Sequence, residues 1–221
     1  TSDFSLIRLQ SRQANKNLDA SEILGSDGIG VAGDTFDSKV VRKLVLPKVG
    51  LNSSYRSTFG HALRVPSWIF RNLERWHYLS FLKSKKNLEL LREISADALE
   101  PEKIAALIHV VEHDLGYPLY KAVEAMKFDL SQNPLAPFVF EDHPLAIQEK
   151  VQRAQFDRWI HPELGMISDS VDRLLGKCHV SPQDIDAVFM TGGSSFVPAV
   201  RQLFARKFGG PERLRQGDEL T

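Results

Sequence analysis

A strand, a glycine-rich turn and a helix follow one another directly in residues 187–208. An apolar run over residues 187–190 is followed by TGGSS at residues 191–195, and a helix-forming segment begins at Pro198. Glycines let a backbone approach a ligand closely, and the first amides of a helix are free to bind an anion. Ligands of α/β proteins bind beyond the carboxyl ends of strands. The segment therefore predicts an α/β fold and a candidate anion site, although many such turns contain glycines for packing alone.

A second turn with glycines precedes a helix-forming segment at residues 29–37. Its Gly33 could bring a main-chain amide to a phosphate or a sugar, and Asp34 or Thr35 could cap the helix. A plain turn explains the same residues. The spacing is not that of a dinucleotide-binding fingerprint, because no third glycine lies in register and no acidic residue follows at the expected distance.

Hydrophobic periodicity predicts short strands and helices over the rest of the chain. Strands are expected in residues 3–9, 20–24, 29–31 and 138–140, and helices in residues 36–45, 68–82, 101–115, 119–130, 147–160 and 163–178. Pro47 and Gly116 are expected to end two of these helices. Residues 49–66 have no clear period, which predicts a loop. The middle of the chain is therefore expected to be mostly helical.

Residues 109–113 (HVVEH) match a zinc-protease pattern, in which two histidines one helical turn apart bind the metal and the glutamate activates water. On a helix, Ile104 and Leu107 would share one face, whereas His109 and His113 would lie on the other, where polar groups are normally solvated. No third ligand can be identified, and the remaining histidines are scattered along the chain. We therefore predict no metal site in this motif.

Charge and cysteine content restrict the partners and the compartment. The 28 Lys and Arg residues balance the 28 Asp and Glu residues, so there is no positive field for binding nucleic acid. No apolar run is long enough to span a membrane, and the first residues do not form a signal peptide. The single Cys178 cannot form an intramolecular disulfide, which favours a small buried hydrophobe in a reducing, cytoplasmic setting. Because Thr1 lies directly inside a strand-like pattern, we expect the chain to be a fragment.

An apolar stripe with two tryptophans lies within residues 49–111. Trp68, Ile69, Leu73 and Trp76 recur at helical spacing. Such stripes usually face a protein core. We predict that this one packs on the helical part of the chain and does not line a ligand site.

Five separated segments share similarity with one known family and occur in that family's order: TSDFSLI at residues 1–7, GDTFD at 33–37, EAMKFDLS at 124–131, VQRAQF at 151–156 and MTGGSSFVP at 190–198. They resemble the nucleotide-binding domain of DnaK-type heat-shock chaperones, which are members of the actin-like ATPase superfamily, and the first segment resembles the tail of that family's second phosphate loop. Further segments resemble the divergent YegD-type branch: the long stretch 49–111, LP at 46–47, EPEK at 100–103 and GDE at 217–219.

The resemblance implies the C-terminal half of an actin-like ATPase fold, an α/β fold of the ribonuclease H-like class with an inserted, mostly helical lobe. We expect residues 1–32 and 161–221 to form the α/β base of the second nucleotide-binding lobe. Residues 33–160 would form the inserted upper lobe, which is mostly helical with a short strand region.

The resemblance also implies contacts to the adenosine of ATP or ADP. Glu124 would bind the ribose, Lys127 would reach the ribose or the adenine edge, and Ser131 would bind the adenine ring. Two positions depart from the family, which usually has an arginine on each side of the adenine, because this chain has Phe128 and Phe196. The two rings either sandwich the base or close a pocket that no longer accepts nucleotide.

Phosphate contacts are implied in the glycine-rich turns. Gly192, Gly193 and Ser194 would bring backbone amides to the α-phosphate and the ribose, and Gly33 would line the cleft opposite them. Glycine amides suit phosphate oxygens, as a carboxylate suits ribose hydroxyls and a cation suits an anionic ligand.

The resemblance implies a chaperone-like ATPase that uses ATP or ADP with Mg²⁺. Thr1 would approach the terminal phosphates, and Asp3 would lie near the metal and its waters. Phosphoryl transfer needs groups on both sides of the cleft, and the sequence lacks the first phosphate loop and the other lobe's catalytic lysine, so we expect this chain alone to be inactive. The expected partners are the N-terminal lobe of the same protein, and unfolded clients or co-chaperones. A non-hydrolysing regulatory module and a sugar-kinase-like protein are the alternatives.

Overall fold

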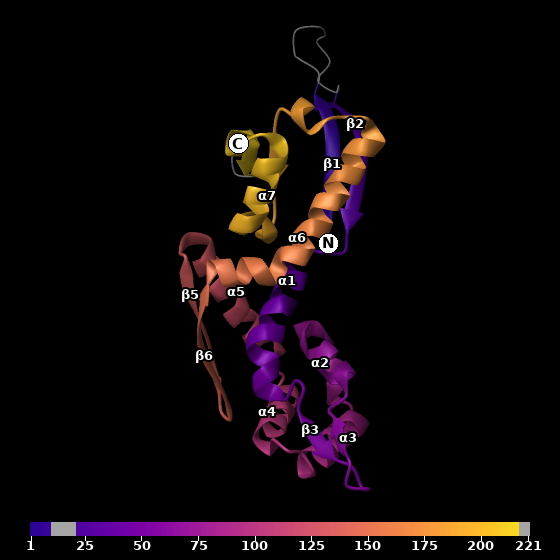
Figure 1. Ribbon diagram of the computed structural model, residues 1–221, viewed down its shortest axis with the longest axis vertical. Helices are drawn as coiled ribbons and strands as arrows, with labels where there is room; N and C mark the ends of the chain where they lie inside the picture. The colour runs from indigo at the N-terminus through magenta and orange to yellow at the C-terminus, as the bar shows by residue number, and fades with distance from the viewer. Residues whose placement is uncertain (10–20, 217–221) are drawn as a thin grey trace. The chain divides into compact units, whose positions relative to one another are not determined.

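The computed structural model describes residues 1–9 and 21–216, and the chain divides into two compact units. Unit 1 comprises residues 1–35 and 160–221, and unit 2 comprises residues 36–159. Figure 1 shows the chain as a ribbon, with the α-helices and several of the strands labelled. Residue 20 of one expected strand and the motif at 217–219 lie outside the described residues.

Unit 1 combines two pairs of strands with helices. The antiparallel pair is β1 (Ser2–Leu9) with β2 (Ser21–Ile29), and the parallel pair is β7 (Val188–Met190) with β8 (Leu214–Gln216). The helical segments are α6 (Arg153–Cys178) from residue 160 onward, α7 (Pro198–Phe208), and the short 3-10 turns η4 (Pro182–Asp184), η5 (Gly193–Phe196) and η6 (Pro211–Arg213). The strand at 187–190 and the helix at 198–208 were both predicted, and both are confirmed.

Helix α7 has clear local signals at both ends. Pro198 occupies its first turn, where a proline's missing N–H group would have no partner in the helix. Gly209 follows its last residue with a φ of +89°, a left-handed conformation that glycine adopts without strain. These signals explain why this helix could be placed from the sequence.

The β1–β2 pair packs against helices of the same unit. The ring centroids of Phe4 in β1 and Phe204 in α7 are 6.2 Å apart. A Cβ atom added to Gly25 in β2 would come within 2.7 Å of Cys178 Sγ and 3.3 Å of Leu174 Cδ1. A larger residue than glycine therefore does not fit here, and the half-buried Cys178 acts as a small packing residue.

A charged cluster, not predicted from the sequence, joins β2 to α6. The Asp27 carboxylate accepts a hydrogen bond from Ser170 Oγ at 3.3 Å and lies 3.3 Å from Arg173 Nε and 3.7 Å from Lys177 Nζ. Burial raises the pKa of Asp27, but the Gly28 amide and the two cations outweigh it, so the pKa is lowered overall. The carboxylate is therefore ionised and fixes the strand to the helix.

Unit 2 begins with a helical run that is longer than predicted. Helix α1 (Gly33–Val40) continues as a π turn, η1 (Val41–Val45), and a 3-10 turn, η2 (Leu46–Val49). Pro47 was expected to stop this run, but it lies in the first turn of η2, where a missing N–H group is tolerated. The run ends at Gly50, whose φ is +94°.

The segment predicted as a loop contains a small hairpin, β3 (Ser54–Arg56) with β4 (Ala62–Arg64). The helix predicted at 68–82 is divided into α2 (Ser67–Leu73) and the 3-10 segment η3 (Trp76–Lys83), because Arg75 is extended. Helix α3 (Lys85–Ala96) follows. Of the predicted apolar stripe, Ile69 and Leu73 are buried in the core of unit 2, whereas Trp68 is half-buried and Trp76 is 42% exposed.

Helices α4 (Pro101–Glu112) and α5 (Gly116–Gln132) agree with the predicted helices except at Gly116. Gly116 was expected to end the first of them, and instead it begins α5. A Cβ atom there would lie 3.0 Å from the main-chain oxygen of Trp76. Glycine is therefore required by the close approach of η3 to α5 and not by a helix end.

The largest error concerns residues 147–160, predicted as one helix. Residues 145–152 form strand β6 (Leu145–Gln152), which pairs antiparallel with β5 (Leu135–Asp142), and α6 begins at Arg153. The predicted helix break before residue 163 is also wrong, because α6 continues through Pro162. A proline inside a helix removes one hydrogen bond, and the long apolar stripe of α6 offsets that loss.

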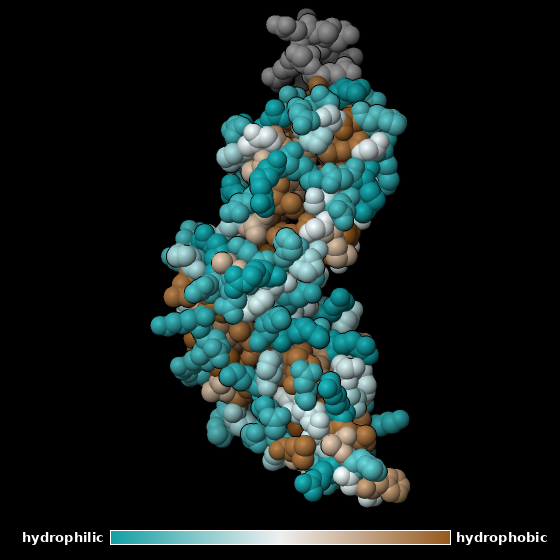
Figure 2. All heavy atoms as spheres, viewed as in Figure 1, coloured by the Kyte–Doolittle hydropathy of each residue, from teal (hydrophilic) through white to brown (hydrophobic). Residues whose placement is uncertain are grey.

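The core of unit 2 is formed by side chains from most of its elements. Fully buried large residues include Phe36 of α1, Phe70 of α2, Phe138 of β5 and Met126 of α5. On the face drawn in Figure 2, hydrophilic residues predominate and hydrophobic residues form smaller patches between them. Among the described residues, no helix is long and apolar enough to cross a membrane.

Candidate functional site

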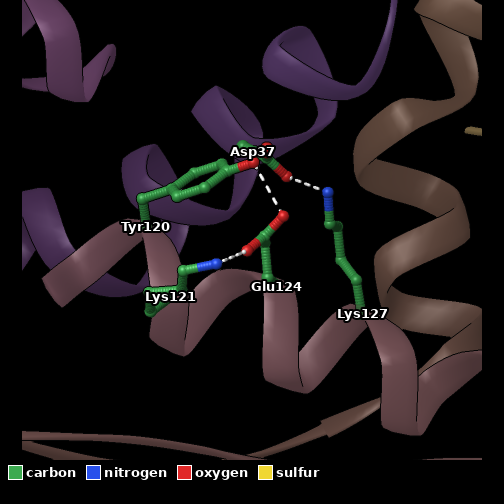
Figure 3. A network of polar contacts seen from close by, with 5 residues as sticks. All are labelled: Asp37, Tyr120, Lys121, Glu124 and Lys127. Carbon is green, nitrogen blue, oxygen red and sulfur yellow. Dashed lines mark hydrogen bonds and ion pairs between the residues drawn. The ribbon is translucent and has the colours of Figure 1, made fainter. Parts of the chain in front are cut away.

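Glu124, the carboxylate expected to bind ribose, lies at the middle of α5 with a donor at each oxygen (Figure 3). The Tyr120 hydroxyl donates to Oε1 at 2.7 Å, and Lys121 Nζ donates to Oε2 at 2.8 Å. The hydrogen bond from Lys121 and then that from Tyr120 lower the pKa of Glu124. The pKa of Lys121 is raised, chiefly by its hydrogen bond to Glu124. The structure thus presents an ionised, oriented carboxylate.

Lys127, one turn further along α5, forms an ion pair with Asp37 of α1. Their side chains are only 18% and 10% exposed, so the pair is largely removed from water (Figure 3). Breaking such a pair leaves an uncompensated buried charge. Asp37 belongs to the family-like motif at residues 33–37, and the sequence predicted no role for it. In the structure Asp37 neutralises the charge of Lys127 and connects α1 to α5.

The end of α5 carries the other two adenosine candidates. The Ser131 hydroxyl donates to the Phe128 carbonyl oxygen at 2.7 Å, while the Phe128 ring is 68% exposed. Arg153 Nε donates to the Leu130 carbonyl oxygen at 2.7 Å and so caps this helix end. Arg153 lies in the family-like segment 151–156, but its capping role was not predicted.

The glycine-rich turn of unit 1 forms η5, between β7 and α7. Gly192 has a φ of +79°, which favours glycine, and its carbonyl oxygen accepts from Ser195 N at 3.0 Å and from Ser195 Oγ at 2.6 Å. A Cβ atom added to Gly192 or to Gly193 would meet nothing within 4 Å. Packing against the described residues therefore does not require a glycine at position 193. Phe196, at its end, is 56% exposed.

Gly33, also in unit 1, lies beside this turn. A Cβ atom on Gly33 would be 3.6 Å from Ser194 Oγ. Near it, Ala32 N donates to Thr35 Oγ1 at 3.5 Å, so Thr35 caps the entry to α1 as one of the two predicted candidates. Gly33 was expected to line the cleft opposite the glycine-rich turn, whereas the structure places it directly beside Ser194 of that turn.

Thr1 and Asp3 lie at the exposed start of β1. Thr1 Oγ1 donates to Asp3 Oδ2 at 3.2 Å, and Asp3 pairs with Gly28 across the sheet. A Cβ atom on Gly28 would lie 2.7 Å from Asp3 Oδ1, so the carboxylate covers this glycine. Phe128 belongs to unit 2 and Phe196 to unit 1, and their stacking on a base stays a prediction.

The side chains of the zinc-protease pattern at residues 109–113 contact other charged groups of the chain. His109 Nε2 lies 2.5 Å from Asp142 Oδ1, and the His109 and His113 rings are 4.2 Å apart. Glu112 is paired with Arg92 at 2.6 Å. Over residues 1–9 and 21–216, no group of three or more His, Cys, Asp or Glu side chains is placed to hold a metal ion.

Comparison with known proteins identifies relatives. The Hsp70 protein family model matches residues 112–217, a stretch that includes α5 and the glycine-rich turn. The chain is 26% identical over 202 residues to the chaperone protein dnaK of Cyanidioschyzon merolae, which covers 90% of the chain and 26% of that relative. It is 32% identical over 112 residues to the chaperone protein DnaK of Thermus thermophilus, which covers 47% of the chain and 18% of the relative.

A third relative is a heat shock protein homolog of Saccharomyces cerevisiae, 27% identical over 92 residues, which covers 41% of the chain and 13% of the relative. The resemblance of the motifs to DnaK-type Hsp70 proteins is thereby confirmed. The chain spans about a quarter, or less, of the length of these curated relatives.

Proposed function

We propose, on the basis that this chain is a relative of the DnaK-type Hsp70 proteins, that it is the ATP-binding half of a chaperone-like ATPase. The similarity implies an actin-like ATPase fold, and the mixed helix and strand structure agrees with it. One observation supports the proposal most directly. The stretch that matches the Hsp70 family model, residues 112–217, contains both the oriented carboxylate of Glu124 in α5 and the open glycine-rich turn.

The adenosine contacts are proposed for α5. Glu124 would accept a hydrogen bond from a ribose hydroxyl, because each carboxylate oxygen has a second lone pair besides the one used by Tyr120 or Lys121. Lys127 would reach the ribose or adenine edge only while sharing its charge with Asp37. Ser131 would have to turn its hydroxyl away from the Phe128 carbonyl to bind the base.

The phosphate contacts are proposed for unit 1. The amides of Gly192, Gly193 and Ser194 would bind the α-phosphate side of the nucleotide, with Gly33 beside them. Asp3 and Thr1 would face the terminal phosphates and the waters of a Mg²⁺ ion. Carboxylate oxygens and waters are the ligands that Mg²⁺ prefers, and the exposed Asp3 carboxylate suits that role.

A comparison of two glutamate variants tests the proposal. In the intact protein, Glu124→Ala should weaken ATP binding several-fold, because one charge-assisted hydrogen bond to the ribose is lost. Glu89→Ala is the matched control, since Glu89 is an exposed glutamate of α3 whose ion pair with Lys85 lies outside the matched stretch. Equal affinities of both variants for ATP, measured by calorimetry, would refute the assignment of Glu124.

A non-hydrolysing regulatory module is the second candidate, and the two phenylalanines favour it. Phe128 and Phe196 replace arginines that the family usually has beside the adenine, which removes two charges. If the rings sandwich the base, Phe128→Ala and Phe196→Ala should each weaken ATP binding about ten- to a hundredfold, as base stacking on an aromatic ring does elsewhere. Unchanged affinity in both variants would exclude the sandwich, and turnover by the intact protein would exclude the regulatory module.

The finer assignments belong to the same proposal. We propose a cytoplasmic protein close to the YegD-type branch, an N-terminal lobe of the same protein as partner, and unfolded clients or co-chaperones as further partners. Residues 1–32 and 161–221 would be the base, and 33–160 the inserted lobe. The long stretch 49–111 supports the branch assignment, because it exceeds what ordinary members of the family carry.

A further inference from the structure

The inserted stretch 49–111 packs directly on the helix that carries Glu124. Its η3 segment approaches the first turn of α5 so closely that a Cβ atom on Gly116 would lie 3.0 Å from Trp76 O and 3.1 Å from Leu79 Cδ2. Leu79 is fully buried at this junction. The contact is therefore part of the core of unit 2, and the position of η3 is fixed relative to α5.

At this junction the rings of Trp76, Tyr117 and Tyr120 lie beside one another and form an aromatic group. The Trp76 ring lies 5.7 Å from the Tyr120 ring at an interplanar angle of 34°, and 5.8 Å from the Tyr117 ring at 64°. Lys121 Nζ lies 5.4 Å from the Tyr117 centroid and 5.8 Å from the Tyr120 centroid. Ring contacts at these separations stabilise a defined ring orientation.

The orientation of the Tyr120 ring decides where its hydroxyl points. In Figure 3 the Tyr120 side chain extends along α5 and its oxygen reaches the carboxylate of Glu124, four residues later. Lys121 reaches the other carboxylate oxygen from the same helix. Both donors to Glu124, Tyr120 and Lys121, thus also contact the rings of the aromatic group.

We propose that Trp76 and Tyr120 are positioning residues for Glu124, so that the inserted stretch sets the geometry of the carboxylate that binds the ribose. This inference rests on the proposed function. Trp76 supports the Tyr120 ring, the Tyr120 hydroxyl holds one carboxylate oxygen, and the remaining lone pairs of Glu124 face the ribose hydroxyl. A carboxylate held in one rotamer loses less conformational entropy when it binds a ligand than a free one does.

A hydroxyl deletion tests the role of Tyr120 in the intact protein. Tyr120→Phe keeps the ring and removes the hydroxyl that donates to Glu124. It should weaken ATP binding about two- to tenfold, the usual effect of losing one hydrogen bond. Binding of the 2′-deoxy and 3′-deoxy forms of ATP should change less, so discrimination between ATP and at least one of these analogues should fall. Tyr78→Phe is the matched control, because Tyr78 lies in the same inserted stretch and its ring packs on His77 and Phe81.

A tryptophan comparison tests the role of the inserted stretch. Trp76→Leu should reduce the same discrimination, whereas Trp68→Leu should not, because Trp76 is the tryptophan of this stretch whose ring lies against Tyr120. Thermal unfolding of both variants separates this effect from a general loss of folding. A carboxyl-carbon NMR titration of Glu124 adds a readout without nucleotide, in which Tyr120→Phe should raise the pKa of Glu124.

The outcomes separate the inference from the function on which it rests. If Glu124→Ala weakens ATP binding while Tyr120→Phe and Trp76→Leu leave both affinity and discrimination unchanged, the positioning inference is overturned and the proposed function stands. If the parent protein binds no ATP, the proposed function falls, and the inference about ribose falls with it. An unchanged Glu124 titration in Tyr120→Phe would contradict the positioning inference whether or not nucleotide binds.

Discussion

Single residues in the glycine-rich turn have separable structural and ligand-binding roles. Gly192 has a positive φ that other residues adopt only with strain, while Gly193 has no positive φ and open space where a side chain would begin. A ligand brought against this turn would occupy that space. The two glycines therefore predict different consequences of the same substitution to alanine.

Gly192→Ala should destabilise the fold by about 1–3 kcal/mol, the cost of placing a Cβ atom at a φ of +79° and a ψ of 166°, a backbone region that is essentially restricted to glycine. Gly193→Ala should leave thermal stability unchanged and should weaken ATP binding in the intact protein, because the new methyl group would lie where the nucleotide approaches. Thermal unfolding and calorimetric titration of both variants check this. A Gly193→Ala protein that unfolds early and binds ATP normally would show that the glycine serves packing.

Among the described residues of unit 1, Asp27 is an aspartate whose ionisation should contribute to stability in acid. Burial raises its pKa, but the Gly28 amide, Lys177 and Arg173 lower the pKa overall in the folded state. The contribution of Asp27 to stability is therefore full above the unfolded pKa, which is about 3.9, and is lost as the pH falls through the folded pKa. The stability of the protein should decline in this acidic range.

Asp27→Asn should lower the unfolding temperature near neutral pH and flatten its dependence on pH below about 4. Asp169→Asn is the matched control, since Asp169 is an exposed aspartate on the same helix α6. The unfolding temperatures of the parent protein and of both variants, measured between about pH 2 and pH 7, test this prediction. An Asp27→Asn protein with the same acid profile as Asp169→Asn would show that the cluster contributes nothing to stability.

Whole elements were predictable where local signals agreed with packing. Residues 198–208 carry a proline at the start and a glycine after the end, and α7 forms there as expected. Residues 147–160 failed because Ile147 and Val151 fit a helical period, while Leu145, Ile147 and Val151 also alternate in the way of a strand. Pairing with β5, which local sequence does not encode, decided between the two.

In the candidate site, the residues that lie in local motifs were predicted from the sequence, and their partners from other segments were not. Glu124 and Lys127 were identified through a motif on one helix, and Gly192, Gly193 and Ser194 through a motif on one turn. Their partners could not be found that way. Tyr120 is local to α5, but its contact with Trp76 joins segments 44 residues apart, from 76 to 120, and the pairing of Lys127 with Asp37 joins two helices.

Helix α6 provides a prediction at the scale of one element. Pro162→Ala restores a helical N–H donor and removes a ring that clashes with the preceding turn, so it should stabilise the chain by about 1–3 kcal/mol. Pro198→Ala is the matched control, because Pro198 lies in the first turn of α7, where no hydrogen bond is lost. Chemical denaturation measures both. A destabilised Pro162→Ala protein would show that the proline is needed for the shape of α6.

For the whole molecule, the chain contains the proposed adenosine and phosphate contacts, whereas the resemblance implies that phosphoryl transfer also needs a first phosphate loop. We predict that it folds by itself, because each unit has its own buried core, and that it does not hydrolyse ATP. Circular dichroism with thermal unfolding tests the first part and a steady-state ATPase assay the second. Turnover by this chain at the rate of an intact DnaK-type protein would contradict the account.

The central claim is that this relative of the DnaK-type Hsp70 proteins binds adenine nucleotides. Calorimetric titration of the intact protein with ATP in the presence of Mg²⁺, followed by displacement with ADP, tests it most directly. The account predicts one saturable site per protein, competition by ADP, and weaker binding in the Glu124→Ala variant than in the Glu89→Ala variant. The absence of any saturable heat up to millimolar ATP would contradict it.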